Sequence, residues 1–129
     1  MTSLKLIQTD KSPAPKGHYS QAVVANGFVF VSGILGIKAD DKEVVLREFE
    51  QQVQICLDNL KNIVEASGSE LGNVVKVNVY IDDIGKWDKV NNAYEKTFAS
   101  HKPARAIIPT RSLHHGLEIE IDAVALVKE

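Results

Sequence analysis

Two charged side chains stand inside apolar runs near the end of the chain, and they are the strongest candidates for chemistry. Arg105 lies within residues 103–109 and Glu120 within residues 117–125, each flanked by aliphatic residues. Burying a fixed charge costs free energy unless an anion meets it, so Arg105 requires a partner carboxylate. That carboxylate belongs either to the protein, across a neighbouring strand, or to a bound ligand. The polar link containing Gly116 predicts that the two runs form a hairpin-like pair of strands.

Motifs of the common hydrolases and nucleotide-binding enzymes are missing. The chain has no P-loop, no Gly-x-Ser-x-Gly elbow and no His-Glu-x-x-His helix. Neighbouring side chains point apart in an extended segment, so we interpret His114 and His115 as part of a solvated loop rather than as a metal chelate. What remains is a site without metal or cofactor, in which an arginine grips a carboxylate and a glutamate, or a water that it holds, transfers protons.

The composition is that of an ordinary globular protein. Its 129 residues, 44% hydrophobic and 25% charged, predict a single domain, residues 1–129, with a core that needs no disulfide. The formal charge of -2 gives no basic field to attract nucleic acid. No run approaches the roughly 20 apolar residues of a membrane span, and no signal-peptide pattern opens the chain. The lone Cys56 is typical of core filler in a reducing compartment, so we predict a cytoplasmic protein.

Hydrophobic patterns predict six strands and two helices. The strands are expected at residues 4–8, 23–25, 28–31, 75–81, 103–109 and 117–125, and the helices at 44–66 and 85–100. This order predicts an α+β sandwich in which two helices cover one face of a mixed sheet. The strand at 28–31 is apolar on both sides. Its second face is therefore expected to be buried by another copy of the chain.

Two further positions leave alternatives open. Gly33 follows the third strand, where the backbone can approach a ligand closely or form a bulge and a turn. Asn91 falls beside the inward stripe expected for the second helix, which consists of Trp87, Val90, Tyr94 and Phe98. An amide in that place needs hydrogen bonds, either from the backbone or from a ligand.

Five separated segments resemble, in order, the signatures of the reactive intermediate deaminase family, also called the YjgF family and historically described as endoribonuclease L-PSP. The segments are residues 17–22, 31–33, 90–91, 103–105 and 119–125. The resemblance runs from end to end. It implies a chorismate-mutase-like fold and a homotrimer, with the sheets forming a central barrel, the helices outside and the ligand clefts between subunits.

The resemblance also implies an activity, the hydrolysis of reactive enamines and imines to 2-keto acids and ammonia without metal or cofactor. Typical substrates are 2-aminoacrylate and 2-iminobutyrate, which are small carboxylates. Arg105 would clamp the substrate carboxylate and Glu120 would hold and polarise the attacking water. Tyr19 would belong to the catalytic set and would line the cleft together with Ser32. Gly33 and the backbone of Ile107 would supply hydrogen bonds, and Asn91 would support the site.

The chain departs from the family pattern at three positions. His18 replaces a usual proline, Ile34 a glutamine, and Ile107 a cysteine or valine. We expect these changes to alter substrate preference through a bulkier, more apolar wall. Two other functions remain open: a non-catalytic module that binds 2-keto acids or regulates partners, and a single-strand RNA endonuclease. For the latter the chain lacks a basic strip laced with aromatic residues.

Overall fold

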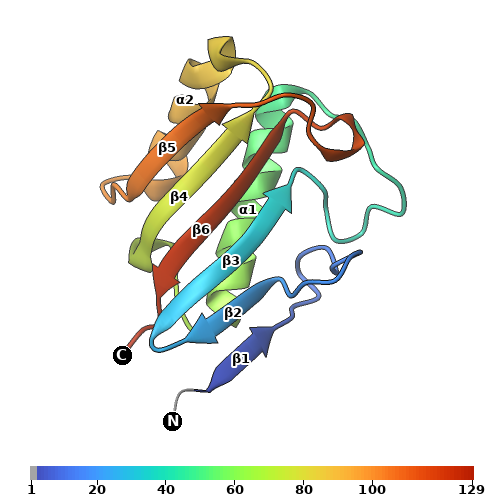
Figure 1. Ribbon diagram of the computed structural model, residues 1–129. Coiled ribbons are helices and arrows are strands. Elements are labelled where there is room, and N and C mark those ends of the chain that lie inside the picture. The colour runs from blue at the N-terminus through green and yellow to red at the C-terminus, as the bar shows by residue number, and fades with distance from the viewer. Residues whose placement is uncertain (1–2) are drawn as a thin grey trace.

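A six-stranded mixed sheet with two α-helices on one face makes up the part of the chain that the computed structural model describes, residues 3–129 (Figure 1). The predicted α+β class is confirmed. In chain order the elements are β1 (Leu4–Ile7), β2 (Ala22–Ala25), β3 (Phe28–Leu35), α1 (Phe49–Ala66), β4 (Val74–Ile81), α2 (Trp87–Phe98), β5 (Ala104–Pro109) and β6 (Ile119–Leu126). Short 3-10 turns precede β4, α2 and β6: η1 (Leu71–Asn73), η2 (Ile84–Lys86) and η3 (His114–Gly116).

The strands lie in the order β1-β2-β3-β6-β4-β5, and β4 and β5 run parallel. The predicted hairpin between the two charged strands is therefore wrong, because β4 lies between β5 and β6. Helix α2 forms the crossover that brings β5 back parallel to β4. The other side of β4 then pairs with β6, which also pairs with β3. As a consequence, Arg105 and Glu120 are not on neighbouring strands.

Alternating apolar residues of the sheet meet the apolar stripe of α1 to form the core. On β4 the buried side chains include Val77 and Val79, and on β3 they include Val29 and Val31. Helix α1 contributes Val53, Cys56, Leu57, Leu60 and Val64. Burying an aliphatic side chain of this size contributes about 1.5–3 kcal/mol. This packing therefore determines which face of each strand is turned toward the helices.

Helix α1 begins at Phe49 rather than at the predicted residue 44. An ion pair holds residues 44–48 outside the helix. The Arg47 guanidinium donates two hydrogen bonds of 2.9 Å to the two carboxylate oxygens of Asp41. The Arg47 carbonyl in turn accepts a 2.8 Å hydrogen bond from Nε2 of Gln52. These local polar contacts outweigh the apolar periodicity that predicted an earlier start.

The second helix is shorter than predicted. Residues 84–86 form η2, and the α-helix itself runs only from Trp87 to Phe98. Val90, Tyr94 and Phe98 of the predicted stripe are buried, but Trp87 is 40% exposed. The first turn of α2 therefore presents an aromatic ring at the surface.

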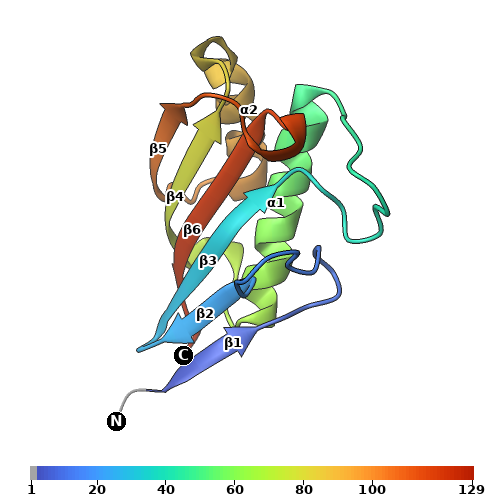
Figure 2. The same cartoon turned by 45° about the vertical axis from the view of Figure 1, so that its right-hand side comes forward.

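The helix-free face of the sheet carries a group of exposed apolar side chains. We call this group the apolar sheet face, and it consists of Leu4, Leu6, Phe28, Phe30 and Leu126. The strand register aligns these residues, because Leu4 and Phe28 both pair with Ala25, and Phe28 also pairs with Leu126. Both views show the helices on the other side (Figures 1 and 2). Strand β3 is thus apolar on both sides, with one side in the core and the other uncovered in a single chain.

Candidate functional site

A bulge in β3 brings a glycine against a carboxylate. The register of β3 with β6 shifts between Val31 and Ile34. A Cβ atom at Gly33 would lie only 2.3 Å from Oε2 of Glu120. Real Cβ atoms do not come this close to another heavy atom, so Glu120 occupies this place only because residue 33 has no side chain. The bulge that was one of the two alternatives at Gly33 is present, and it accommodates a carboxylate.

Glu120 has the electrostatic character of a proton-transfer group. Burial raises the pKa of its carboxyl, the neighbouring Asp122 raises that pKa further, and His114 lowers it. A carboxyl whose pKa is shifted toward neutrality releases and takes up protons more readily near neutral pH. Glu120 is therefore suited to act as a general base.

The loop before β2 is fixed against β3 by hydrogen bonds. The buried side chain of Gln21 accepts a 2.7 Å hydrogen bond from the Thr9 amide and donates to the carbonyls of Thr9 at 3.1 Å and Pro13 at 2.9 Å. The Ser32 hydroxyl donates to the Ser20 carbonyl at 2.5 Å. Tyr19 is thereby presented at the surface beside the bulge, with 55% of its area exposed.

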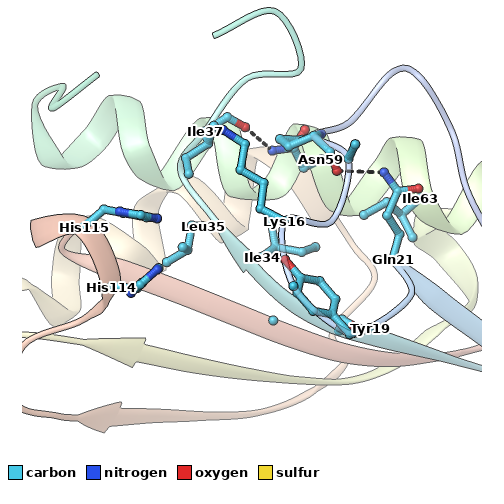
Figure 3. Close-up of a pocket in the computed structure, with 15 residues that line it drawn as sticks. Lys16, Tyr19, Gln21, Ile34, Leu35, Ile37, Asn59, Ile63, His114 and His115 are labelled. Atoms are coloured by element: carbon cyan, nitrogen blue, oxygen red, sulfur yellow. Dashed lines mark hydrogen bonds between the residues drawn. The ribbon is translucent and has the colours of Figure 1, made fainter. Parts of the chain in front are cut away.

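A cavity of about 250 Å³ lies between this loop, the end of β3 and α1 (Figure 3). Tyr19, Ser32 and Gly33 line it, as the family resemblance implies for the cleft. Its apolar wall consists of Ile34, Leu35, Ile37 and Ile63. The cavity thus joins an aliphatic wall to the bulge that accommodates Glu120.

His114 and His115 also line this cavity, at the end opposite Tyr19 (Figure 3). Their interpretation as no more than a solvated loop is incomplete, because both rings are exposed and yet border the candidate site. The two ring centroids are 3.7 Å apart. Adjacent side chains meet here because the segment is not extended: His115 has a φ of 62°, in the left-handed region. The following Gly116 was the sequence signal for a tight turn.

Arg105 lies on the face of the sheet that the helices cover, whereas Glu120 lies on the opposite face. The register partner of Arg105 on β4 is Val77, which is buried beneath the helices. The guanidinium carbon lies 5.3 Å from the ring centroid of Trp87 and 5.0 Å from that of Tyr94, both on α2. Such contacts stabilise a cation without neutralising it. Among residues 3–129 no ion pair of Arg105 is formed, so the alternative of an internal acidic partner has no support there.

The single chain therefore assembles only part of the predicted site. It brings together Tyr19, Ser32, Gly33 and Glu120, and it places Arg105, Ile107 and Asn91 with β5 and α2. The Asn91 amide donates to Oε1 of Glu95 on the same helix at 3.2 Å, rather than to the backbone. Ile107 is half-buried and pairs with Val79, on the same face as Arg105.

Cys56 is a core residue, as predicted. It is fully buried, and its sulfur lies 3.5 Å from the carbonyl oxygen of Ile34. Burial raises the pKa of the Cys56 thiol far above its ordinary value, which suppresses the nucleophilic thiolate. In the described part of the chain, no helix combines the length and apolar character that crossing a membrane requires.

The fold and these groups define a class of small α+β protein with a glutamate at a sheet bulge and an arginine held by aromatic rings near a sheet edge. The chain belongs to the reactive intermediate deaminase family, since the family model described as Endoribonuclease L-PSP matches residues 9–127. A RutC family protein of Aquifex aeolicus is 42% identical over 95% of this chain and 99% of its own length. The 2-iminobutanoate/2-iminopropanoate deaminase of Rattus norvegicus is 37% identical over 95% of this chain and 89% of its own.

Solved structures show the same fold. The crystal structure of yeast Mmf1 is 36% identical and matches with a TM-score of 0.92, covering 98% of this chain and all of that one. The yeast protein is named as mitochondrial, and a matching reactive intermediate deaminase of Arabidopsis thaliana as chloroplastic. These names differ in compartment, so the cytoplasmic location of this chain stays a prediction.

Proposed function

We propose that the protein hydrolyses reactive enamines and imines of amino acids, of the 2-iminobutyrate type, to 2-keto acids and ammonia. The observation that carries this proposal is the state of Arg105. Its guanidinium is held between two aromatic rings and meets no carboxylate among residues 3–129. An arginine in this state has its hydrogen-bond donors available for the carboxylate of a small substrate. The deaminase names of relatives support the same chemistry.

A complete site requires a second copy of the chain. Arg105 and Glu120 are on opposite faces of the sheet and on strands separated by β4. We therefore propose that β5 of one subunit meets the bulge of another, within the homotrimer that the family resemblance implies. Two features support this assembly: β5 is a terminal strand of the sheet, and the apolar sheet face is uncovered in a single chain.

In the proposed reaction the substrate carboxylate binds Arg105 of one subunit, and the imine carbon lies beside Glu120 of the next. Glu120 accepts a proton from water as the water oxygen bonds to the imine carbon. The same proton then passes to the nitrogen, which gives a carbinolamine. Glu120 next takes the proton of the carbinol hydroxyl and passes it to the nitrogen as the carbon–nitrogen bond breaks, so that the carbonyl of the keto acid forms and ammonia leaves. An enamine first takes a proton on carbon to become the imine. Orientation and one proton shuttle are sufficient, because the imine is already electrophilic.

The test is a coupled assay with threonine dehydratase and threonine, which generate 2-iminobutyrate in situ. We expect the protein to accelerate 2-ketobutyrate release over buffer, and we expect Arg105→Ala to lose this acceleration through a raised KM. Glu120→Gln should lower kcat by at least about 100-fold, the scale of a lost general base. Absence of acceleration, or full activity in Arg105→Ala, would exclude the proposal. Binding of 2-ketobutyrate without any turnover would identify a keto-acid-binding module instead.

A further inference from the structure

The cavity beside the bulge is larger than a substrate of the 2-iminobutyrate type requires. Its volume is about 250 Å³, whereas the side chain of 2-iminobutyrate is a single ethyl group. The space continues from Gly33 along Ile34 and Ile37 toward Ile63 on α1. A ligand that fills it has an aliphatic section longer than two carbons.

Most polar groups in the cavity wall are already bonded within the protein. The Gln21 amide is used by the loop backbone, and the Ser32 hydroxyl donates to the Ser20 carbonyl. Asn59 donates from its side-chain nitrogen to the Ile37 carbonyl at 2.8 Å. These groups hold the wall in place and have few donors left for a ligand.

The donors that remain are almost all cationic or able to become so. Lys16, His114 and His115 line the cavity, and the part of the chain that the structure describes pairs none of them with a carboxylate. Figure 3 shows the histidines at one end of the cavity and Lys16 between them and Tyr19. No aspartate or glutamate of the described residues is among the lining residues. His114 lowers the pKa of Glu120, but the Glu120 carboxylate lies against Gly33, outside the lining.

We infer that the preferred substrate is a dicarboxylic imine or enamine, whose side chain ends in a second carboxylate. The aliphatic section lies along Ile34 and Ile37, and the terminal carboxylate meets Lys16 and the two histidines. The first carboxylate meets Arg105 of a neighbouring subunit, so this inference rests on the proposed function. This substrate differs from the mono-carboxylate imines in the names of the relatives. The inference assigns specificity to the loop before β2, which carries Lys16, and to the loop before β6, which carries the two histidines.

The experiment measures binding of three stable keto acids to the assembled protein by titration calorimetry. The first probe is 2-ketobutyrate. The second is 2-oxoglutarate, and the third is 5-methyl-2-oxohexanoate, whose isopropyl group has the shape of the second carboxylate without its charge. We expect 2-oxoglutarate to bind at least about tenfold more tightly than its uncharged analogue, the scale of one hydrogen bond to a charged group. The double variant Lys16→Met/His115→Asn should lose that preference and keep its affinity for 2-ketobutyrate.

The matched control is Lys102→Met, which removes one exposed lysine that is not among the cavity-lining residues and should keep the preference. Equal binding of the two longer probes, tighter binding of the uncharged one, or an unchanged preference in the double variant would overturn the inference. In each of these cases 2-ketobutyrate binding that depends on Arg105 would leave the proposed function intact. If none of the three keto acids binds, the inference fails, and the coupled assay with threonine dehydratase decides the proposed function separately.

Discussion

At the scale of single residues, the arginine that should hold the substrate is itself held by aromatic rings. Tyr94 is buried and lies under the guanidinium of Arg105, while Trp87 covers it from the first turn of α2. A cation over an aromatic face gains roughly 0.5–2 kcal/mol. The rings therefore orient Arg105 and leave its charge available, which a carboxylate in the same place would not do.

This arrangement predicts different outcomes for two substitutions of Tyr94. Tyr94→Leu removes the ring and should weaken 2-ketobutyrate binding by about two- to thirtyfold, the range that corresponds to a lost cation–π contact. Tyr94→Phe keeps the ring and removes a hydroxyl that has no hydrogen-bond partner among residues 3–129. It should leave affinity unchanged and the melting temperature equal or higher, because an unsatisfied buried hydroxyl costs stability. Calorimetry and thermal unfolding measure both effects. Equal loss of affinity in the two variants would show that the hydroxyl, not the ring, matters.

Gly33 offers a second prediction at this scale. Gly33→Ala places a methyl group 2.3 Å from Oε2 of Glu120 and must displace that carboxylate. We expect kcat in the coupled assay to fall by more than about tenfold, since misplaced catalytic groups lose rate steeply. The melting temperature should change little, because the displaced atom is the end of a side chain. Gly72→Ala is the control, since its Cβ meets the Glu70 carboxylate at an ordinary 3.5 Å. A fully active Gly33→Ala variant would remove Glu120 at the bulge from the mechanism.

At the scale of elements, the strands and helices could be predicted from local pattern, but the pairing of strands that are distant in sequence could not. The alternation of Val77, Val79 and Ile81 placed β4 and its buried face correctly. Val75, predicted on the same face, is instead 43% exposed, because the register of β4 with β6 shifts between Val74 and Lys76. The insertion of β6 between β3 and β4 depends on pairing between segments distant in sequence, for which local turn signals carry no information. The site followed the same rule. The structure groups Tyr19, Ser32, Gly33 and Glu120 as the motifs implied. The predicted pairing of β5 with β6, which is wrong, placed Arg105 closer to Glu120 than it lies in the structure.

The loop before α1 yields a prediction about acid. The Arg47 guanidinium, which donates hydrogen bonds to Asp41, lowers the pKa of that carboxyl to about 2, with a further contribution from the Lys38 amide. A carboxyl whose folded pKa is lowered stabilises the fold above its unfolded pKa, near 3.9, and this contribution is lost as pH falls toward the folded value. Between about pH 4 and pH 2 the segment at residues 38–48 should therefore become susceptible to an acid-active protease such as pepsin. Asp41→Asn should show that susceptibility across the whole acidic range in which pepsin is active, and a wild-type loop that stays resistant at pH 2 would contradict the role of the pair.

At the scale of the whole molecule, the placement of Arg105 and Glu120 makes assembly a condition for the proposed activity. In one chain Arg105 faces the helices and Glu120 the opposite side, with β4 between their strands. If each subunit contributes one group to a site shared with its neighbour, two inactive variants should restore activity when they assemble together. Arg105→Ala and Glu120→Gln, unfolded together and refolded at equal amounts, should form mixed oligomers. By random assortment, about a quarter of the sites in a cyclic trimer would then combine an intact arginine with an intact glutamate.

We expect such a mixture to recover about a quarter of the wild-type deaminase rate, while each variant refolded alone stays inactive. Mixing the two folded variants without unfolding is the control, because intact oligomers that do not exchange subunits form no hybrid sites. A rate in the refolded mixture no higher than that of the separate variants would show that both groups must come from the same chain. The separation of Arg105 from Glu120 across the sheet would then require a rearrangement within the subunit, rather than a neighbour, to bring substrate carboxylate and water together.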